Sequence, residues 1–186
     1  TYVVWDSGDK EIELAGEGTD RVLARVSTTL GANVERLSLI GTAAINGTGN
    51  ADANVMIGNE AANVLNGAGG ADRLTGRGGA DTFEFAASGS AGKRVVITDF
   101  QGGTDRLLIE ADTLSALHGF SGKPLTGADL ALGSKATTAD QHLIYDAKTG
   151  ALSYDADGAG GQAQIKIAVL LGHPDLQASD IGVIAI

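Results

Sequence analysis

The chain has 186 residues and a formal net charge of −10, from 23 acidic and 13 basic residues. This excess of negative charge repels nucleic acid and anionic lipid and favours a cationic partner. The sequence contains no Cys, which excludes disulfides, zinc–thiolate sites and thiol nucleophiles. No apolar run approaches the roughly 20 residues that a membrane-spanning helix needs, so we expect no insertion into a membrane.

Glycine is the most informative part of the composition, with 28 Gly against only 2 Pro. Near the N-terminus, residues 15–23 read AGEGTDRVL, in which a glycine-containing segment precedes Asp20 and the apolar Val22. Gly tolerates positive φ and lets backbones approach closely, so this segment predicts a tight turn followed by a short strand. The same scheme recurs with greater regularity from Gly49.

Four consecutive nine-residue units begin at Gly49: GNADANVMI, GNEAANVLN, GAGGADRLT and GRGGADTFE. Each unit starts with Gly and has Asn or Asp in sixth place and an apolar residue in eighth place. The sixth-place residues are Asn54, Asn63, Asp72 and Asp81. The eighth-place residues are Met56, Leu65, Leu74 and Phe83. Agreement at three positions in every unit indicates a repeat architecture.

The repeat unit suggests how it folds. Its glycine-rich part forms a turn, and its last three residues form a short strand that points one apolar side chain inward. A pair of units would complete one coil of a flattened solenoid, in which each strand pairs with the strands above and below. Met56 and Leu74 would line one face of the core, and Leu65 and Phe83 the other. The sequence therefore predicts an all-β fold, a parallel β-roll.

A core this thin does not offset the entropy lost in ordering so much glycine, at about 1–2 kcal/mol per residue. Stacked turns present carbonyl oxygens and sixth-place carboxylates, and Ca²⁺ takes about six to eight such oxygens in forgiving geometry. Calcium binding would then be part of the folding free energy. The expected ligands are four Asp carboxylates and four Gly carbonyls: Asp72, Asp81, Asp20, Asp99, Gly67, Gly69, Gly76 and Gly78.

Asp99 has two interpretations. It lies 18 residues beyond Asp81, which is the length of one coil. If the solenoid continues that far, both carboxylates would face one ion. Alternatively, Asp99 caps the turn that follows the strand at residues 95–98.

Residues 100–186 are predicted to form an antiparallel β cap that follows the roll. The predicted strands cover residues 95–98, 107–109, 142–145, 151–155 and 165–171. Residues 111–117 are expected to form one or two helical turns. Asp155 and Asp157 stand beside Gly, and we interpret them as part of a solvated hairpin turn, with an incomplete calcium loop as the alternative.

No catalytic motif is found. HExxH, GxSxG and a Walker-type phosphate loop are absent, so we expect that this chain alone is not an enzyme. The histidines have no mutual spacing that suggests a metal site or triad: His118, His142 and His173. Four aromatic residues are interpreted as core residues, with stacking on a sugar as the alternative: Tyr2, Trp5, Tyr145 and Tyr154.

At the four units the chain resembles the repeats-in-toxin (RTX) proteins, whose nonapeptide G-G-x-G-x-D-x-U-x binds calcium in a parallel β-roll. The third and fourth units depart from this pattern only at the second Gly, where Ala68 and Arg77 stand. The first and second units lack the fourth-place Gly and carry Asn54 and Asn63 instead of Asp. Sites that use these two uncharged residues should be weak or empty.

Weaker resemblance extends to both sides of the repeats. Residues 1–48 look like the irregular β coils that precede the regular repeats in secreted RTX proteins, and residues 49–99 are predicted to form the calcium-binding nonapeptide β-roll. Residues 100–186 are similar to the cap that closes the roll in serralysin-type proteases and mannuronan epimerases. The tail, residues 177–186, resembles an uncleaved type I secretion signal, although a final β-strand would look the same.

The resemblance implies a calcium-binding C-terminal module of a secreted bacterial protein. Such a module meets the type I secretion machinery, folds on calcium after export, outside the cell or at its surface, and stabilises a parent protein whose catalytic domain is separate. The alternative is an accessory or adhesion module that binds an acidic polysaccharide or a surface. Clustering of four basic residues on one face would favour that alternative: Arg73, Arg77, Lys93 and Arg94.

Overall fold

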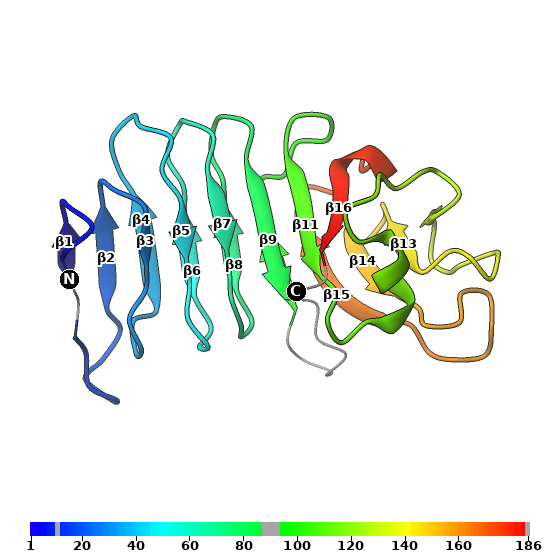
Figure 1. Cartoon of the computed structure of the whole chain (residues 1–186), viewed down its shortest axis with the longest axis horizontal. Helices are drawn as coiled ribbons and strands as arrows, with labels where there is room; N and C mark the ends of the chain where they lie inside the picture. Colours follow the sequence, from blue (N-terminus) through cyan, green and yellow to red (C-terminus); the bar gives the residue numbers. More distant parts are fainter. Residues whose placement is uncertain (10–11, 87–93, 185–186) are drawn as a thin grey trace.

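A computed structural model describes residues 1–9, 12–86 and 94–184, and these residues are nearly all strand and turn. Short strands coil around a long axis so that two sheets face each other (Figure 1). The described helical segments are two short 3₁₀ helices, η1 (Ser115–Phe120) and η2 (Ala178–Asp180). Neither is long and apolar enough to cross a bilayer.

The first sheet has ten described strands and the second has six. In spatial order the first contains β1 (Tyr2–Val4), β2 (Arg21–Ala24), β4 (Arg36–Leu39), β6 (Val55–Ile57), β8 (Arg73–Thr75), β10 (Val95–Ile97), β15 (Ile165–Leu170), β14 (Ala151–Tyr154), β13 (Leu143–Asp146) and β12 (Leu130–Leu132). The second contains β16 (Ile181–Ile184), β11 (Arg106–Glu110), β9 (Thr82–Ala86), β7 (Val64–Asn66), β5 (Gly47–Thr48) and β3 (Thr28–Thr29).

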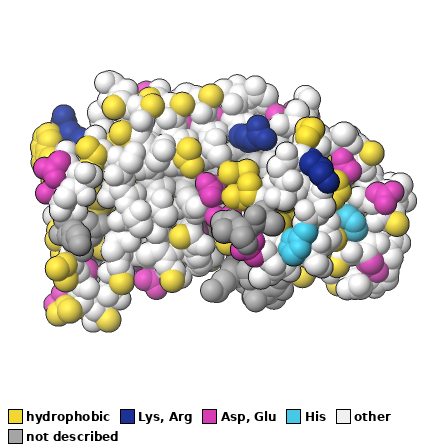
Figure 2. Space-filling view, in the orientation of Figure 1, with side chains coloured by type: hydrophobic (Ala, Val, Ile, Leu, Met, Phe, Trp, Pro, Cys, Tyr) yellow, Lys and Arg dark blue, Asp and Glu magenta, His cyan; other side chains and the backbone are white. Residues whose placement is uncertain are grey.

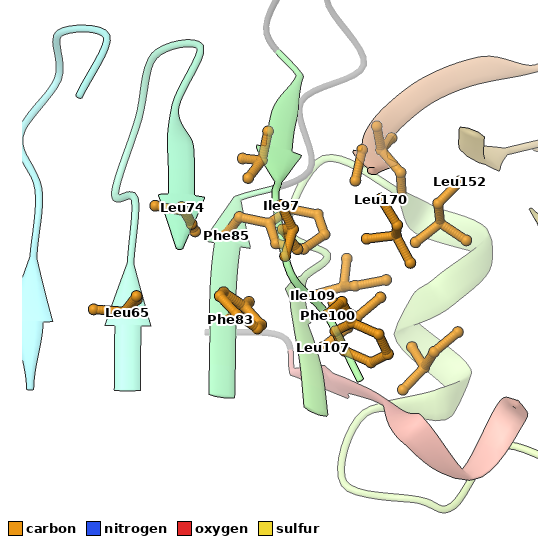
Figure 3. Close-up of a cluster of buried hydrophobic side chains, with 14 of the residues drawn as sticks. Leu65, Leu74, Phe83, Phe85, Ile97, Phe100, Leu107, Ile109, Leu152 and Leu170 are labelled. Atoms are coloured by element: carbon orange, nitrogen blue, oxygen red, sulfur yellow. The ribbon is translucent and has the colours of Figure 1, made fainter. Parts of the chain in front are cut away.

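The repeat strands alternate between the two sheets, as predicted. Met56 pairs with Leu74 in the first sheet, and Leu65 pairs with Phe83 in the second. All four side chains are fully buried in one core cluster. Figure 3 shows Leu65, Leu74 and Phe83 in this cluster, which reaches into the cap at Leu152 and Leu170. The prediction of a parallel β-roll is therefore confirmed, with one inward apolar residue on each of β6, β7 and β8 and a second one, Phe85, beside Phe83 on β9.

The cap continues both sheets of the roll. The pairs β13–β14 and β14–β15 are antiparallel, while β12 joins β13 in parallel. β15 pairs in parallel with β10, so the hairpin strands extend the first sheet directly. The tail returns as β16, which pairs in parallel with β11. The all-β fold with an antiparallel cap is confirmed, and residues 181–184 of the tail form a strand.

The expected domain boundaries remain predictions. β4 pairs with β6 across the boundary expected at residue 48, and β9 pairs with β11 across the boundary expected at residue 99. The sheets and the buried cluster are thus continuous through both positions.

Three expectations are corrected. The coil after Asp81 is longer than 18 residues, because Arg106 lies opposite Thr82. The helical turns occupy Ser115–Phe120 rather than residues 111–117. Trp5 is 59% exposed, whereas Tyr145 and Tyr154 are buried as expected and Tyr2 is partly buried against the core.

The second residue of each well-matched unit adopts a left-handed backbone. Ala68 has φ 62° and Arg77 has φ 73°, whereas the fifth-place residues Ala71 and Ala80 do not have positive φ. Left-handed geometry costs a non-glycine residue roughly 1–2 kcal/mol. This conformation explains why the RTX pattern has Gly in second place.

We expect Ala68→Gly and Arg77→Gly each to raise the free energy of unfolding, by about 0.5–1 kcal/mol. Relief of the left-handed strain exceeds the roughly 0.4–1 kcal/mol of unfolded-chain entropy that Gly adds. Ala71→Gly and Ala80→Gly are matched controls in the same turns and should lower stability by about 0.4–1 kcal/mol. Urea unfolding at a fixed calcium concentration measures all four changes. Equal effects at second and fifth places would contradict this account.

Candidate metal centre

The glycine-rich turns stack along the two long edges of the roll, where the strands of one sheet connect to those of the other (Figure 1). One edge, here the Asp72 edge, contains residues 49–54 and 67–72. The other, the Asp81 edge, contains residues 58–63, 76–81 and 98–105. Asp72 and Asp81 therefore belong to separate sites on opposite edges of the roll, as expected for consecutive units that alternate between the sheets.

On the Asp72 edge, the Asp72 carboxylate lies between two stacked turns. Its side chain is 2% exposed, and Oδ1 accepts a hydrogen bond of 2.9 Å from the backbone N–H of Asn54 in the preceding coil. Its Oδ2 lies directly over Gly67, where any Cβ would collide with it. The backbone N–H of Gly69 donates to the carbonyls of Gly67 (2.9 Å) and Asn50 (3.2 Å). The Asp72 carboxylate and the Gly67 and Asn50 carbonyls therefore lie in the same pair of stacked turns.

On the Asp81 edge, the Asp81 carboxylate occupies the equivalent place. Its Oδ1 accepts a hydrogen bond of 2.8 Å from the backbone N–H of Asn63, and its Oδ2 lies over Gly76, where a Cβ would collide with it. This Oδ2 is buried and has no hydrogen-bond partner. A buried, unpartnered carboxylate oxygen is costly unless a cation or a proton satisfies it.

More carboxylates surround Asp81 than Asp72. Asp105 lies in the next coil and accepts hydrogen bonds from the backbone N–H groups of Asp81 (3.0 Å) and Gln101 (2.8 Å). Asp99 lies opposite Gly76 and accepts hydrogen bonds from the N–H groups of Gly76 (2.9 Å) and Arg77 (2.8 Å). Asp105 is therefore the residue that occupies, in the next coil, the position equivalent to Asp81. The prediction of a coil of 18 residues pointed to Asp99 and missed Asp105.

Burial without a counter-charge raises the pKa values of these acids. Desolvation raises the pKa of Asp72 to about 7, against a smaller opposing effect of the hydrogen bond from Asn54. Desolvation also raises the pKa of Asp81 to about 6, and the charges of Asp105 and Asp99 add to this effect. The pKa of Asp105 is raised by burial as well. A divalent cation would remove this penalty by stabilising the ionised carboxylates.

Asp20 lies in the same column of turns as Asp72 but in a different coil. The register from β2 through β4 and β6 to β8 stacks the residues that precede these strands: Asp20, Glu35, Asn54 and Asp72. Asp20 donates its backbone N–H to Glu35 Oε2 at 2.8 Å and pairs with the N-terminal amine at 3.5 Å. It does not join Asp72 in one site. Glu35 is a further carboxylate of this column, and no nonapeptide match pointed to it.

The two Asn units build the same turns without charge. Asn54 Oδ1 accepts from the N–H of Asn50, and Asn63 Oδ1 accepts from the N–H of Asn59, each at 2.8 Å. Their amide groups donate to carbonyls of the preceding coil. These side chains are satisfied by hydrogen bonds alone, which fits the prediction that sites using them are weak or empty.

The geometry fits a calcium ion that is held largely by backbone oxygens. Among the described residues, no group of three or more His, Asp or Glu side chains is arranged to hold a metal by itself. Two features of the turns fit a bound calcium ion. Asp81 Oδ2 has no hydrogen-bond partner, and the glycines beneath both carboxylates leave open the space that a side chain would fill. The residues that would hold calcium are Asp72 with the Gly67 and Gly69 carbonyls, and Asp81 with the Gly76 and Gly78 carbonyls and the nearby Asp99.

Asp155 and Asp157 stay within one loop of the cap. Asp157 Oδ2 accepts from the N–H groups of Gly161 (2.9 Å) and Gln162 (3.2 Å), and Asp155 Oδ1 accepts from the N–H of Asp157 (3.3 Å). These are the hydrogen bonds of a capped turn, but Asp155 is buried and Asp157 Oδ1 is buried without a hydrogen-bond partner, so the turn is not solvated as predicted. The incomplete calcium loop stays the alternative interpretation. Two of the histidines, His118 and His142, each contact backbone carbonyls of the cap.

The four basic residues considered for polysaccharide binding do not form one cluster. Arg73 lies on β8, and Arg94 precedes the neighbouring strand β10. Arg77 lies in the Asp81 edge, beyond the opposite end of β8 from Arg73, and Lys93 is outside the described residues. Acidic side chains do not cluster either on the face shown in Figure 2, where they are scattered over a mostly uncharged surface.

Comparison with known families identifies the repeat. The family model of the RTX calcium-binding nonapeptide repeat, in four copies, matches residues 48–83. These residues carry both candidate turns of the well-matched units. The chain therefore contains an RTX calcium-binding repeat module, of a type found in secreted proteins. A search of curated proteins found no match.

Proposed function

We propose that the chain is the calcium-dependent folding module of a protein exported by type I secretion, of the serralysin or mannuronan-epimerase type, and that it has no catalytic activity of its own. In the low calcium of a bacterial cytosol, the carboxylates of the turns repel one another and the roll is destabilised. Outside the cell, millimolar calcium exceeds the 10⁻⁴–10⁻³ M affinities of typical extracellular sites and drives folding. The folded roll then stabilises the parent protein.

The observation that carries this proposal is the buried carboxylate of Asp81 with its unpartnered Oδ2. Asp72 and Asp105 add further buried carboxylates, and no ion pair offsets any of the three among the described residues. Buried ionised carboxylates without cations oppose folding at neutral pH. A fold with this arrangement gains stability from a divalent cation, and its folding therefore reports the calcium concentration.

The test is far-UV circular dichroism of the whole chain, stripped with chelator and then titrated with calcium. We expect a cooperative gain of β signal with a midpoint of about 10⁻⁴–10⁻³ M. Magnesium at the same concentration serves as the control, since it demands near-octahedral geometry and should not reproduce the transition. A chain that is fully folded in chelator, with a melting temperature that calcium does not change, would contradict the proposal.

Export is tested separately from calcium binding. The chain is expressed in a bacterium with and without a type I transporter, and its amount in the medium is compared with that of a variant lacking residues 177–186. We expect transporter-dependent release that the deletion abolishes. Release that is independent of the transporter would refute the export role and leave the calcium titration as the measure of the folding role.

A further inference from the structure

The loop that joins β14 to β15, residues 155–164, lies in the cap and begins with two acids (Figure 1). Asp155 and Asp157 are separated by a single residue and are followed by Gly158. Asp155 is 7% exposed, although it is ionisable and lies in a connection between strands. Burial of an ionised carboxylate is costly unless a counter-charge or hydrogen bonds stabilise it. The two carboxylates therefore need partners, and their surroundings indicate of which kind.

Each of the two carboxylates has one oxygen that accepts no hydrogen bond. Asp157 Oδ2 accepts from the N–H groups of Gly161 and Gln162, whereas Asp157 Oδ1 is buried and has no partner. Asp155 Oδ1 accepts a long hydrogen bond of 3.3 Å from the N–H of Asp157, and no described residue donates to Asp155 Oδ2. The two carboxyl groups also lie within hydrogen-bonding reach of each other. Neighbouring acceptors without donors need a cation or a proton between them.

No basic side chain of the described residues neutralises this pair of acids. The ion pair that the structure shows there joins the N-terminal amine to Asp20, at the other end of the first sheet. Lys135 lines the cavity beside Asp155, but it is exposed and forms no ion pair with either carboxylate. His142 Nδ1 lies 2.9 Å from the backbone carbonyl of Asp155 rather than from its carboxylate. The negative charge of the loop is therefore uncompensated.

Backbone carbonyls and open space adjoin the two carboxylates. Gly158 has φ 60°, and a Cβ at this position would lie 2.5 Å from the Ala139 carbonyl oxygen and 2.6 Å from that of Thr138. The Ala139 carbonyl accepts no hydrogen bond from the described residues. A cavity of about 500 Å³ is lined by Asp155 and Gly158 among others, which leaves room for water molecules. Oxygen ligands of several kinds are therefore gathered around one loop.

We propose that this loop binds one calcium ion between the carboxylates of Asp155 and Asp157, with carbonyl oxygens of the facing residues 138–139 and water as further ligands. Oxygen ligands in an irregular, glycine-rich loop suit calcium better than metals that prefer nitrogen or sulfur ligands or strict geometry. The site lies outside the matched repeats, so the proposal goes beyond calcium-dependent folding of the roll. The ion ties the β14–β15 connection to the β12–β13 connection and so fixes the four strands that end the first sheet.

A proton shared between the two acids explains this arrangement less well than a cation. Burial opposes ionisation of Asp157, but hydrogen bonds from the N–H groups of Gln162 and Gly161 outweigh it and lower the pKa of Asp157. Asp157 is therefore ionised at neutral pH. Burial and the adjacent Asp157 raise the pKa of Asp155. One shared proton would leave a negative charge in the loop and would not engage the Ala139 carbonyl, whereas a divalent cation satisfies both.

The first test counts the calcium ions bound to the folded full chain. Equilibrium dialysis with radioactive calcium is carried out at neutral pH, at a calcium concentration that gives the full β signal in circular dichroism. We expect Asp155→Asn/Asp157→Asn to bind one ion fewer than the wild type. The control Asp112→Asn/Asp175→Asn removes the same charge from exposed positions of the cap and should bind the wild-type number of ions.

Equal numbers of ions in the wild type and in Asp155→Asn/Asp157→Asn would overturn the proposal, and this is the result that a shared proton predicts. Loss of an ion from the control as well would reduce the effect to net charge and would also overturn it. Lys135→Gln tests the remaining source of positive charge. If Lys135 neutralised the two acids, this variant would gain an ion that the wild type lacks, whereas we expect the same number in both.

The second test locates the ion in the wild-type chain and does not depend on the folding of any variant. Traces of gadolinium, a paramagnetic substitute for calcium, are added to the calcium-loaded chain, and the amide NMR signals are recorded. We expect broadening at Gly158, Gly160 and Gly161 that excess calcium reverses. Signals of this loop that stay sharp would overturn the proposal. Folding of the roll is followed separately by circular dichroism, so a failure of the cap site is distinguished from a failure of calcium-dependent folding.

Discussion

The variant Asp72→Asn/Asp81→Asn is expected to need at least about tenfold more calcium for half-maximal folding than the wild type. Each substitution removes a negative charge from a candidate calcium turn. Asn retains Oδ1, so the hydrogen bonds from the N–H groups of Asn54 and Asn63 can persist. The measurement is the calcium dependence of the β signal in far-UV circular dichroism.

The same variant is expected to show the opposite effect without calcium. Burial disfavours the ionised carboxylates of Asp72 and Asp81 and raises their pKa values to about 7 and about 6. Above these values the metal-free folded state contains buried charges, because the carboxylates are ionised. Removing the charges should therefore leave stability in chelator at pH 8 unchanged or raised, while lowering stability in calcium. Such opposite effects on stability, with and without calcium, distinguish the loss of a calcium ligand from general damage to the fold.

The control for both measurements is Asp140→Asn/Asp175→Asn. Both residues are exposed in the cap, and the change in net charge is identical. We expect wild-type calcium dependence from this control. A double Asp72/Asp81 variant with wild-type calcium dependence, or a control that shifts equally, would show that the two repeat carboxylates do not bind the ion.

Phe83→Ala is expected to lower the free energy of unfolding in saturating calcium by about 3–5 kcal/mol. Phe83 is fully buried between the two sheets, and its ring packs against Phe100 with centroids 6.1 Å apart and planes tilted by 48°. Phe85 is the other inward side chain of β9, and each of the other repeat strands has one, so few neighbouring side chains can fill the cavity. Because folding and calcium binding are linked, the calcium midpoint should rise as well.

Urea unfolding measures this loss, with Leu132→Ala as the control. Leu132 is 71% exposed at the end of the cap, and its truncation should change stability by no more than about 0.5 kcal/mol. A loss below about 1 kcal/mol for Phe83→Ala would mean that the roll does not depend on its inner row of side chains.

The sequence alone was sufficient for the repeat and its consequences. The nine-residue period predicted which side chain of each unit enters the core, and Met56, Leu65, Leu74 and Phe83 are all fully buried. It also predicted that Asp72 and Asp81 occupy equivalent turns. These predictions succeed because a regular repeat leaves one way to stack turns and strands, and both the turn chemistry and the strand pattern are local.

Only the tertiary structure decided what happens where the repeat ends. Extra residues move the sixth place from Asp99 to Asp105: Val96 lies opposite Arg73 and Arg106 opposite Thr82, so the insertion lies mainly between β9 and β10. A period of nine cannot reveal an insertion in the coil that follows. Pairing of β16 with β11 and of β15 with β10 depends on contacts between distant segments. Coils of unequal length likewise bring Arg21, Arg36 and Arg73 to equivalent positions of their strands. Local patterns determine the turns and the inward side chains, whereas the alignment of one coil with the next determines which charges meet.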